Sequence, residues 1–145
     1  MDYSKTQEYL NKWQDILRLR DWDIKIQYVE KEWRKTGDIK IDMEDRIAIL
    51  LLNKFNPRQT NLEELIIHEL LHLKLYGMDQ MIETLMDCVY GNNENDPKKI
   101  FAYNQFMTML ESTVNDLAKS YLSQIGENKE ISYGRLNEEI IKEIG

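Results

Sequence analysis

The two histidines of this 145-residue chain lie four residues apart in the stretch EELIIHELLHLKLYG. His68, Glu69 and His72 therefore spell H-E-x-x-H within an apolar segment. Residues four apart lie on the same face of a helix, so the two imidazoles can bind one metal ion. Glu69 is rotated by about a quarter turn from His68, where it can reach a water that the ion activates. This is the arrangement that zinc-assisted hydrolysis requires.

The segment around the motif is apolar nearly all round, which predicts that its helix is buried. Burying two imidazoles and a carboxylate without partners costs about 1–3 kcal/mol for each unsatisfied group, and more for a charge. A metal ion would satisfy all three groups together. The alternative is that the histidines are ordinary core residues with hydrogen-bond partners. The apolar residues of the segment are Leu62, Leu65, Ile66, Ile67, Leu70, Leu71, Leu73 and Leu75.

A third ligand must come from outside the motif, because catalytic zinc sites usually take three protein ligands and keep one open position. Both histidines are used, so the third ligand is acidic or is Cys88. We expect Glu111, in the middle of a predicted helix beside Leu110 and Val114, where a surface charge is unusual. Alternatively, Glu111 lies at the edge of the apolar face of its helix and its side chain reaches solvent. Cys88 is expected to be a small buried residue. The other acidic candidates are Glu83, Asp87, Glu94 and Asp96.

The elements that must position these residues are a helix, three strands and further helices, which predicts an α+β domain in two layers. Residues 4–19 have apolar side chains at helical spacing and predict an N-terminal backing helix. The stretches DWDIKIQYVE, GDIKIDM and RIAILLLN predict a small three-stranded twisted sheet. We expect the last strand, Arg46–Asn53, to be either the edge strand beside the cleft or a central strand.

The second half of the chain is predicted to be helical. We expect the motif helix to run from Leu62 to Tyr76 and to end at Gly77, a natural C-cap. A shorter helix over Asp79–Val89 and a long helix carrying Glu111 follow. Residues 1–126 are expected to form one domain, and residues 127–145 a tail with an amphipathic helix. That helix either docks on the core or covers the cleft or a partner.

Composition and charge exclude several classes of partner. A net charge of -7 argues against binding to nucleic acid or to an anionic membrane surface. No apolar run reaches membrane-spanning length, and the stretch MDYSKTQEYL does not resemble a signal peptide. A single cysteine cannot form an intrachain disulfide. We therefore expect a cytoplasmic protein and a monomer, without membrane or nucleic-acid partners.

H-E-x-x-H on a buried helix, followed by a glutamate on a downstream helix, resembles the gluzincin metallopeptidases. The order of elements over about residues 15–122 is similar to that of minimal gluzincin-type, zincin-like domains. The resemblance implies a zinc-dependent endopeptidase that binds one Zn²⁺ per chain and acts on a peptide or protein substrate. In it, His68, His72 and Glu111 bind the metal and Glu69 is the general base.

The chain departs from the gluzincin pattern at two points. Many gluzincins place an aspartate four residues after the glutamate ligand, and this chain has Asn115 there. Larger gluzincins supply a histidine or tyrosine to the developing oxyanion; the candidates here are Tyr76, Tyr103 and Arg46. The alternative function is therefore a non-catalytic, metal-bound zincin-like domain that acts as a structural, partner-binding or regulatory module.

Overall fold

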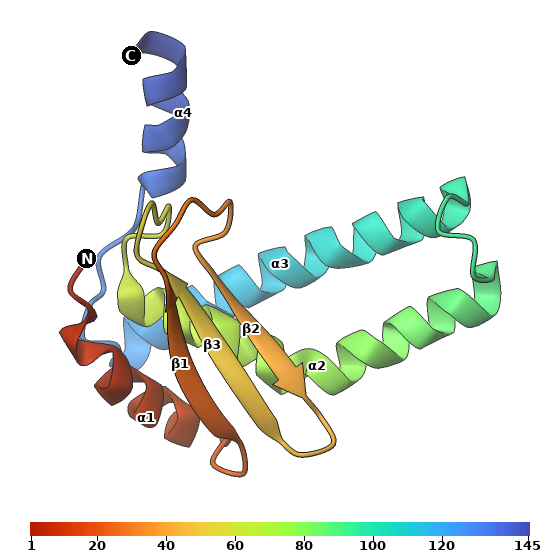
Figure 1. The fold of residues 1–145 in the computed structure, drawn as a ribbon, viewed down its shortest axis with the longest axis horizontal. Helices are drawn as coiled ribbons and strands as arrows, with labels where there is room; N and C mark the ends of the chain where they lie inside the picture. Colours follow the sequence, from red (N-terminus) through yellow and green to blue (C-terminus); the bar gives the residue numbers. More distant parts are fainter.

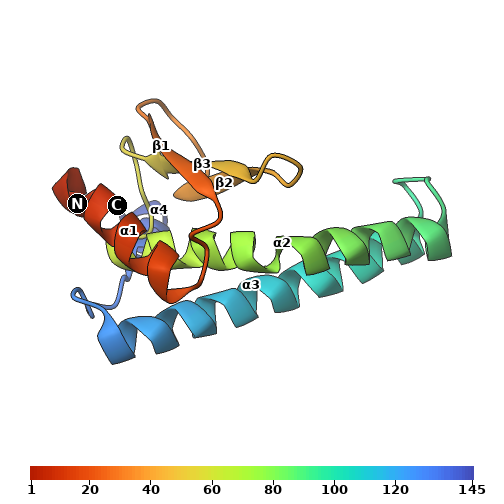
Figure 2. The same ribbon diagram turned by 90° about the horizontal axis from the view of Figure 1, so that it is seen from below.

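A computed structural model describes all of residues 1–145 and confirms the α+β class. A short 3-10 turn over Tyr3–Lys5 precedes the first helix. The sheet and α1 lie on one side of α2, and α3 runs along its other side (Figure 2). The helices are α1 (Thr6–Ile16), α2 (Leu62–Tyr90), α3 (Pro97–Ile125) and α4 (Gly134–Ile144), and the strands are β1 (Asp23–Val29), β2 (Gly37–Asp42) and β3 (Ile47–Asn53).

The sheet has the order β1-β3-β2, so β3 is its central strand. β3 pairs in parallel with β1 and antiparallel with β2. The option that placed Arg46–Asn53 at the sheet edge is therefore wrong. The nearly continuous apolar run of β3 suits a strand with neighbours on both sides, whereas β2 alternates apolar residues with Asp38 and Lys40. The edge strand that packs near α2 is β2.

The hydrophobic core lies where α1, the sheet, the first half of α2 and the last part of α3 meet. Side chains from all four elements are fully buried there. This places the motif segment of α2 at the centre of the protein, as its apolar composition predicts. The fully buried apolar residues are Leu10, Trp13, Leu50, Leu52, Ile66, Ile67, Leu70, Val114 and Ala118.

α2 is one helix of 29 residues, and the predicted break at Gly77 is wrong. The helix ends instead at Gly91, whose positive φ of 84° suits a glycine cap. A glycine inside a helix costs only about 1 kcal/mol, which packing against α3 offsets. The second half of α2 and the first half of α3 project beyond the sheet as a helical hairpin (Figure 1). Cys88 lies on this hairpin and is exposed, so the expectation that it is buried is wrong.

The tail helix does not pack into the hydrophobic core. Residues 127–132 lie against the start of α2, where the Asn61 side-chain amide donates to the carbonyl oxygens of Asn128 and Glu130, both at 2.8 Å. α4 itself has no buried residue and stands away from the core (Figure 1). The apolar residues expected to dock, Leu136, Ile140, Ile141 and Ile144, are all exposed. Separately, none of the helices combines the length and the apolarity needed to cross a membrane.

Candidate metal centre

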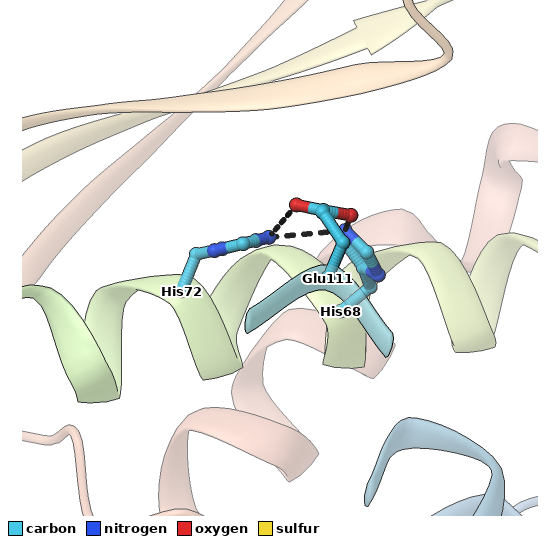
Figure 3. A group of neighbouring side chains, drawn as sticks. All are labelled: His68, His72 and Glu111. Carbon is cyan, nitrogen blue, oxygen red and sulfur yellow. Dashed lines mark hydrogen bonds and ion pairs between the residues drawn. The ribbon is translucent and has the colours of Figure 1, made fainter. Parts of the chain in front are cut away.

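His68, His72 and Glu111 meet between α2 and α3, below the sheet (Figure 3). The Nε2 atoms of His68 and His72 are 3.2 Å apart. The Glu111 carboxylate places Oε1 at 2.7 Å from His72 Nε2 and Oε2 at 3.4 Å from His68 Nε2. Two imidazole nitrogens and a carboxylate thus point to one spot.

The geometry of the three side chains fits a shared zinc ion. One ligand atom from each residue lies within 4.8 Å of the others. Nitrogen and oxygen ligands bound tetrahedrally to zinc at about 2.0–2.1 Å lie about 3.3 Å from one another. The separation of the two imidazole nitrogens, 3.2 Å, and that of His68 Nε2 from Glu111 Oε2, 3.4 Å, are close to this value. The contact of 2.7 Å involves the other carboxylate oxygen, Oε1, and has the length of a charge-assisted hydrogen bond. A donor set of two imidazoles and one carboxylate is characteristic of catalytic zinc.

The local sequence explains why these side chains converge. Asn61 caps α2 by accepting a hydrogen bond from the backbone N–H of Glu64 at 3.0 Å, which fixes where the helix begins. His68 and His72 are then one turn apart and lie on the same face of α2. On α3, Glu111 is three residues before Val114 and seven before Ala118, both of which are buried. Packing of this apolar stripe holds α3 against α2 and directs Glu111 toward the histidines.

Glu69 lies beside the group but is more deeply buried, with 6% of its surface exposed. Its Oε1 is 3.8 Å from His68 Nε2, too far for a hydrogen bond. Burial raises the pKa of Glu69 to about 8, because the charged carboxylate is poorly solvated. A nearby divalent cation would favour the charged form and lower this pKa. The Glu69 carboxylate is therefore suited to accept a proton beside a metal ion.

The two histidines differ in their electrostatic surroundings. Burial lowers the pKa of His68, and the neighbouring His72 ring lowers it further. Burial also disfavours the charged form of His72, but the hydrogen bond to Glu111 and the nearby carboxylate charges together outweigh it and raise the pKa of His72. The same hydrogen bond lowers the pKa of Glu111. Without a metal ion, both shifts favour the charged forms of His72 and Glu111, whose contact is 2.7 Å long.

A cavity of about 630 Å³ opens above the candidate metal centre. The motif residues and Glu111 form part of its wall, together with β2, the preceding loop and the start of α4. Tyr76 and Asn115 also line it, and Asn115 interacts with the His68 ring. Arg46 pairs with Asp21 and does not line this cavity, and Tyr103 lines a separate cavity of about 410 Å³ on the hairpin. Of the three predicted oxyanion candidates, only Tyr76 reaches the site.

The remaining candidate ligands lie elsewhere. Glu94 and Asp87 pair with the Lys99 ammonium at 2.6 and 2.7 Å, near the tip of the hairpin. Glu83 lines the cavity beside them, and Asp96 caps α3 by accepting from the backbone N–H of Lys98. None of these side chains is close to the two histidines.

Asp79 is a site residue that the sequence reasoning missed. It lines the cavity, and its Oδ1 is buried without a hydrogen-bond partner. Burial raises the pKa of Asp79, while the charge of His72 lowers it. Seven residues separate Asp79 from His72, which places both on one face of a continuous helix. The break predicted at Gly77 concealed this relation.

Comparison with known proteins does not identify the chain. No protein-family model, no curated protein and no solved structure matches it. The function is therefore inferred from the residues of the site and from their geometry.

Proposed function

We propose that the protein is a zinc-dependent peptidase that binds one Zn²⁺ per chain through His68, His72 and Glu111. The observation that carries this proposal is the convergence of their three ligand atoms within 4.8 Å. Glu69 lies beside them, and the cavity opens onto them. This combination supports the gluzincin-like interpretation of the H-E-x-x-H motif and the downstream glutamate.

Zinc bound by these residues would polarise the scissile carbonyl and make a water nucleophilic at neutral pH. The Glu69 carboxylate would act as the general base, taking a proton from the attacking water and passing it to the leaving amine. Its burial excludes competing water from the carboxylate. Tyr76 lines the same cavity and is the candidate to donate a hydrogen bond to the developing oxyanion.

β2 is the element of the sheet that would hold an extended peptide. Its ladder to β3 leaves the opposite edge of the strand without a partner strand. Gly37, Asp38, Ile39 and Ile41 of this strand line the cavity. A substrate that pairs with the free edge by main-chain hydrogen bonds would therefore run across the metal centre. We propose an endopeptidase on this basis, acting as a monomer in the cytoplasm.

A non-catalytic, metal-bound module that binds a partner is the second candidate. The observation that favours it is α4, whose apolar residues Leu136, Ile140 and Ile144 are spaced four apart and are exposed. An unpartnered amphipathic helix is a common way to dock another protein. In this alternative Glu69 has no proton to transfer.

Glu69→Gln separates the two candidates. A peptidase variant would retain about one zinc per chain and lose turnover by about 10²–10⁴-fold, the usual contribution of a general base. The matched control is Glu8→Gln, because Glu8 is an exposed residue of α1 far along the chain from the site. Hydrolysis of a mixed peptide pool that is equal in the wild type and in Glu69→Gln would contradict the peptidase proposal.

A further inference from the structure

Three cationic side chains without an ion-pair partner line the cavity above the metal centre. They are Arg34, in the loop before β2, Lys119, on α3, and Arg135, in the first turn of α4. None of them has a carboxylate oxygen within 4.0 Å, although the chain carries a net charge of -7. We call these three residues the cationic rim. Unpaired cations on a cavity wall are available to attract an anionic group of a ligand.

The other charges in the cavity are largely compensated. Asp38 pairs with Lys35 at 2.8 Å and with Lys40 at 3.1 Å. Arg58 pairs with Glu138 at 2.6 Å. Glu69 and Glu111 belong to the metal centre, where a divalent cation would offset their charges. Glu64 and Asp79 also line the cavity without an ion pair, and Glu64 accepts a hydrogen bond from the Gln59 side chain. The cationic rim is thus the unpaired positive charge of the cavity wall, and its three cations outnumber these two carboxylates.

Arg135 is the member of the cationic rim that belongs to the tail of the chain. It lines the same cavity as Glu111 on α3 and His68 on α2, the two helices that meet at the metal centre. A carboxylate held by Arg135 would therefore lie in the cavity that opens onto the metal centre.

The position of Arg135 is held by contacts on both sides of it in the chain. Before it, Ser132 Oγ accepts a hydrogen bond from the Thr60 backbone N–H at 2.9 Å. After it, Glu138 pairs with Arg58. Gly134 lies directly against the Arg58 backbone, where an added Cβ would collide with the carbonyl oxygen. The first turn of α4 is therefore fixed against the cavity even though the rest of the helix is exposed.

We propose that the cationic rim selects peptides that carry a carboxylate close to the cleaved bond, and that Arg135 is the main specificity-determining residue. The inference rests on the proposed peptidase function and names its substrate class, an acidic peptide. A guanidinium presents paired N–H donors that match both oxygens of a carboxylate, which gives orientation as well as attraction. The carboxylate belongs either to an Asp or Glu side chain or to the C-terminus of the peptide.

Binding of labelled decapeptides to the full chain tests this assignment without turnover. The chain carries Glu69→Gln and is incubated with zinc, and fluorescence anisotropy measures Kd. Three peptides blocked at both ends differ only in having Glu, Gln or Lys at three central positions. We expect the Glu peptide to bind about tenfold or more tightly than the Gln peptide, as charge-assisted hydrogen bonds imply, and the Lys peptide to bind weakest. A second Gln peptide with a free C-terminal carboxylate identifies which source of the carboxylate is used.

Variants locate the preference. Arg135→Gln should reduce the ratio of Gln-peptide to Glu-peptide Kd by about tenfold, and Arg135→Lys should restore part of it because the charge returns. The matched control is Arg18→Gln, because Arg18 is exposed, has no ion pair and lies outside the cavity. Equal affinity for the Glu and Gln peptides in the chain that retains all three residues of the cationic rim would overturn the proposal. A loss in Arg135→Gln that is the same for all peptides would also overturn it, since a structural role predicts that result.

The inference and the proposed function fail in different ways. Hydrolysis of the Gln and Glu peptides at equal rates by the wild type would support a peptidase and refute the acidic preference. A preference for the Glu peptide that depends on Arg135, in a wild type that hydrolyses no peptide, would support the cationic rim and refute the peptidase.

Discussion

Glu63 should be the most sensitive single carboxylate for stability, although it takes no part in the chemistry. Its side chain is fully buried at the start of α2. Oε2 accepts hydrogen bonds from Trp13 Nε1 at 2.6 Å and Lys12 Nζ at 3.0 Å, and Oε1 accepts from the backbone N–H groups of Glu127 and Asn128 at 2.8 and 3.0 Å. One carboxylate thus joins α1, α2 and the beginning of the tail.

Glu63→Gln keeps the shape of the side chain and removes half of its accepting capacity. The amide oxygen can still accept from the two backbone N–H groups, but the amide nitrogen then faces the Trp13 indole N–H and the Lys12 ammonium. The buried Trp13 indole N–H loses its acceptor, which costs about 1–3 kcal/mol. The Lys12 ammonium loses its ion pair and keeps its hydrogen bond to the Ile125 carbonyl oxygen at 2.7 Å, and a lost hydrogen bond to a charged group costs about 1.5–3 kcal/mol. We expect the free energy of unfolding to fall by about 2–5 kcal/mol, a large part of the 5–15 kcal/mol typical of a domain.

Urea denaturation followed by circular dichroism measures this change, with the midpoint shift read at constant slope. Glu8→Gln is the control, since Glu8 is exposed and should change stability by less than about 0.5 kcal/mol. If the unfolding free energy of Glu63→Gln lies within about 0.5 kcal/mol of the wild-type value, the assignment of Glu63 as the joint between helices and tail is refuted.

The pH dependence gives the same prediction an independent check. Burial raises the pKa of Glu63, but the hydrogen bonds it accepts outweigh burial and hold the pKa below its ordinary value of 4.5. A depressed pKa in the folded state contributes stability that is present above the unfolded-state pKa. That contribution is lost as the pH falls from about 4.5 through the folded-state value. Glu63→Gln should lack this part of the acid destabilisation, which denaturation midpoints at pH 3–7 would reveal.

Two further predictions concern α2 and the tail. Gly77→Ala should raise the unfolding free energy by about 0.5–1 kcal/mol, because Gly77 is inside a continuous helix and an added Cβ would meet only Met43 Cε at 3.5 Å; a loss of stability would contradict the single helix. Truncation after Gly126 should destabilise the chain, because Glu63 and Asn61 lose their partners in residues 127–130. The preference for acidic peptides should vanish as well, because Arg135 is removed. If the truncated chain folds and hydrolyses peptides faster than the wild type, the tail instead blocks the cleft.

Local pattern was sufficient to predict the part of the site that lies on one helix. His68, Glu69 and His72 are set by spacing alone, since a helix places residues four apart on the same face. Glu111 could also be proposed from the sequence, because a carboxylate beside Leu110 and Val114 departs from the pattern of a surface residue. Its actual distance from the histidines depends on how α3 packs against α2, which no local pattern contains. The same dependence left Glu83 and Asp87 open as alternatives.

The errors arose where tertiary packing decides between options that are locally equivalent. Gly77 is a common C-cap, but α3 continues alongside α2 past this position and the helix does not end. An apolar strand such as Arg46–Asn53 suits either a central or an edge position until its neighbours are known. Arg135 had no local signal as a site residue, because its place at the cavity depends on contacts of the tail with Thr60 and Arg58.

Zinc content of the purified chain tests the central claim most directly. Elemental analysis after exhaustive dialysis should find about one zinc per chain in the wild type. His72→Ala and Glu111→Ala should each lose the zinc, because the two side chains meet at 2.7 Å in the proposed centre. Glu83→Ala, on the hairpin, should retain it. Full zinc occupancy in Glu111→Ala, or a wild type that binds no zinc, would contradict the proposed metal centre.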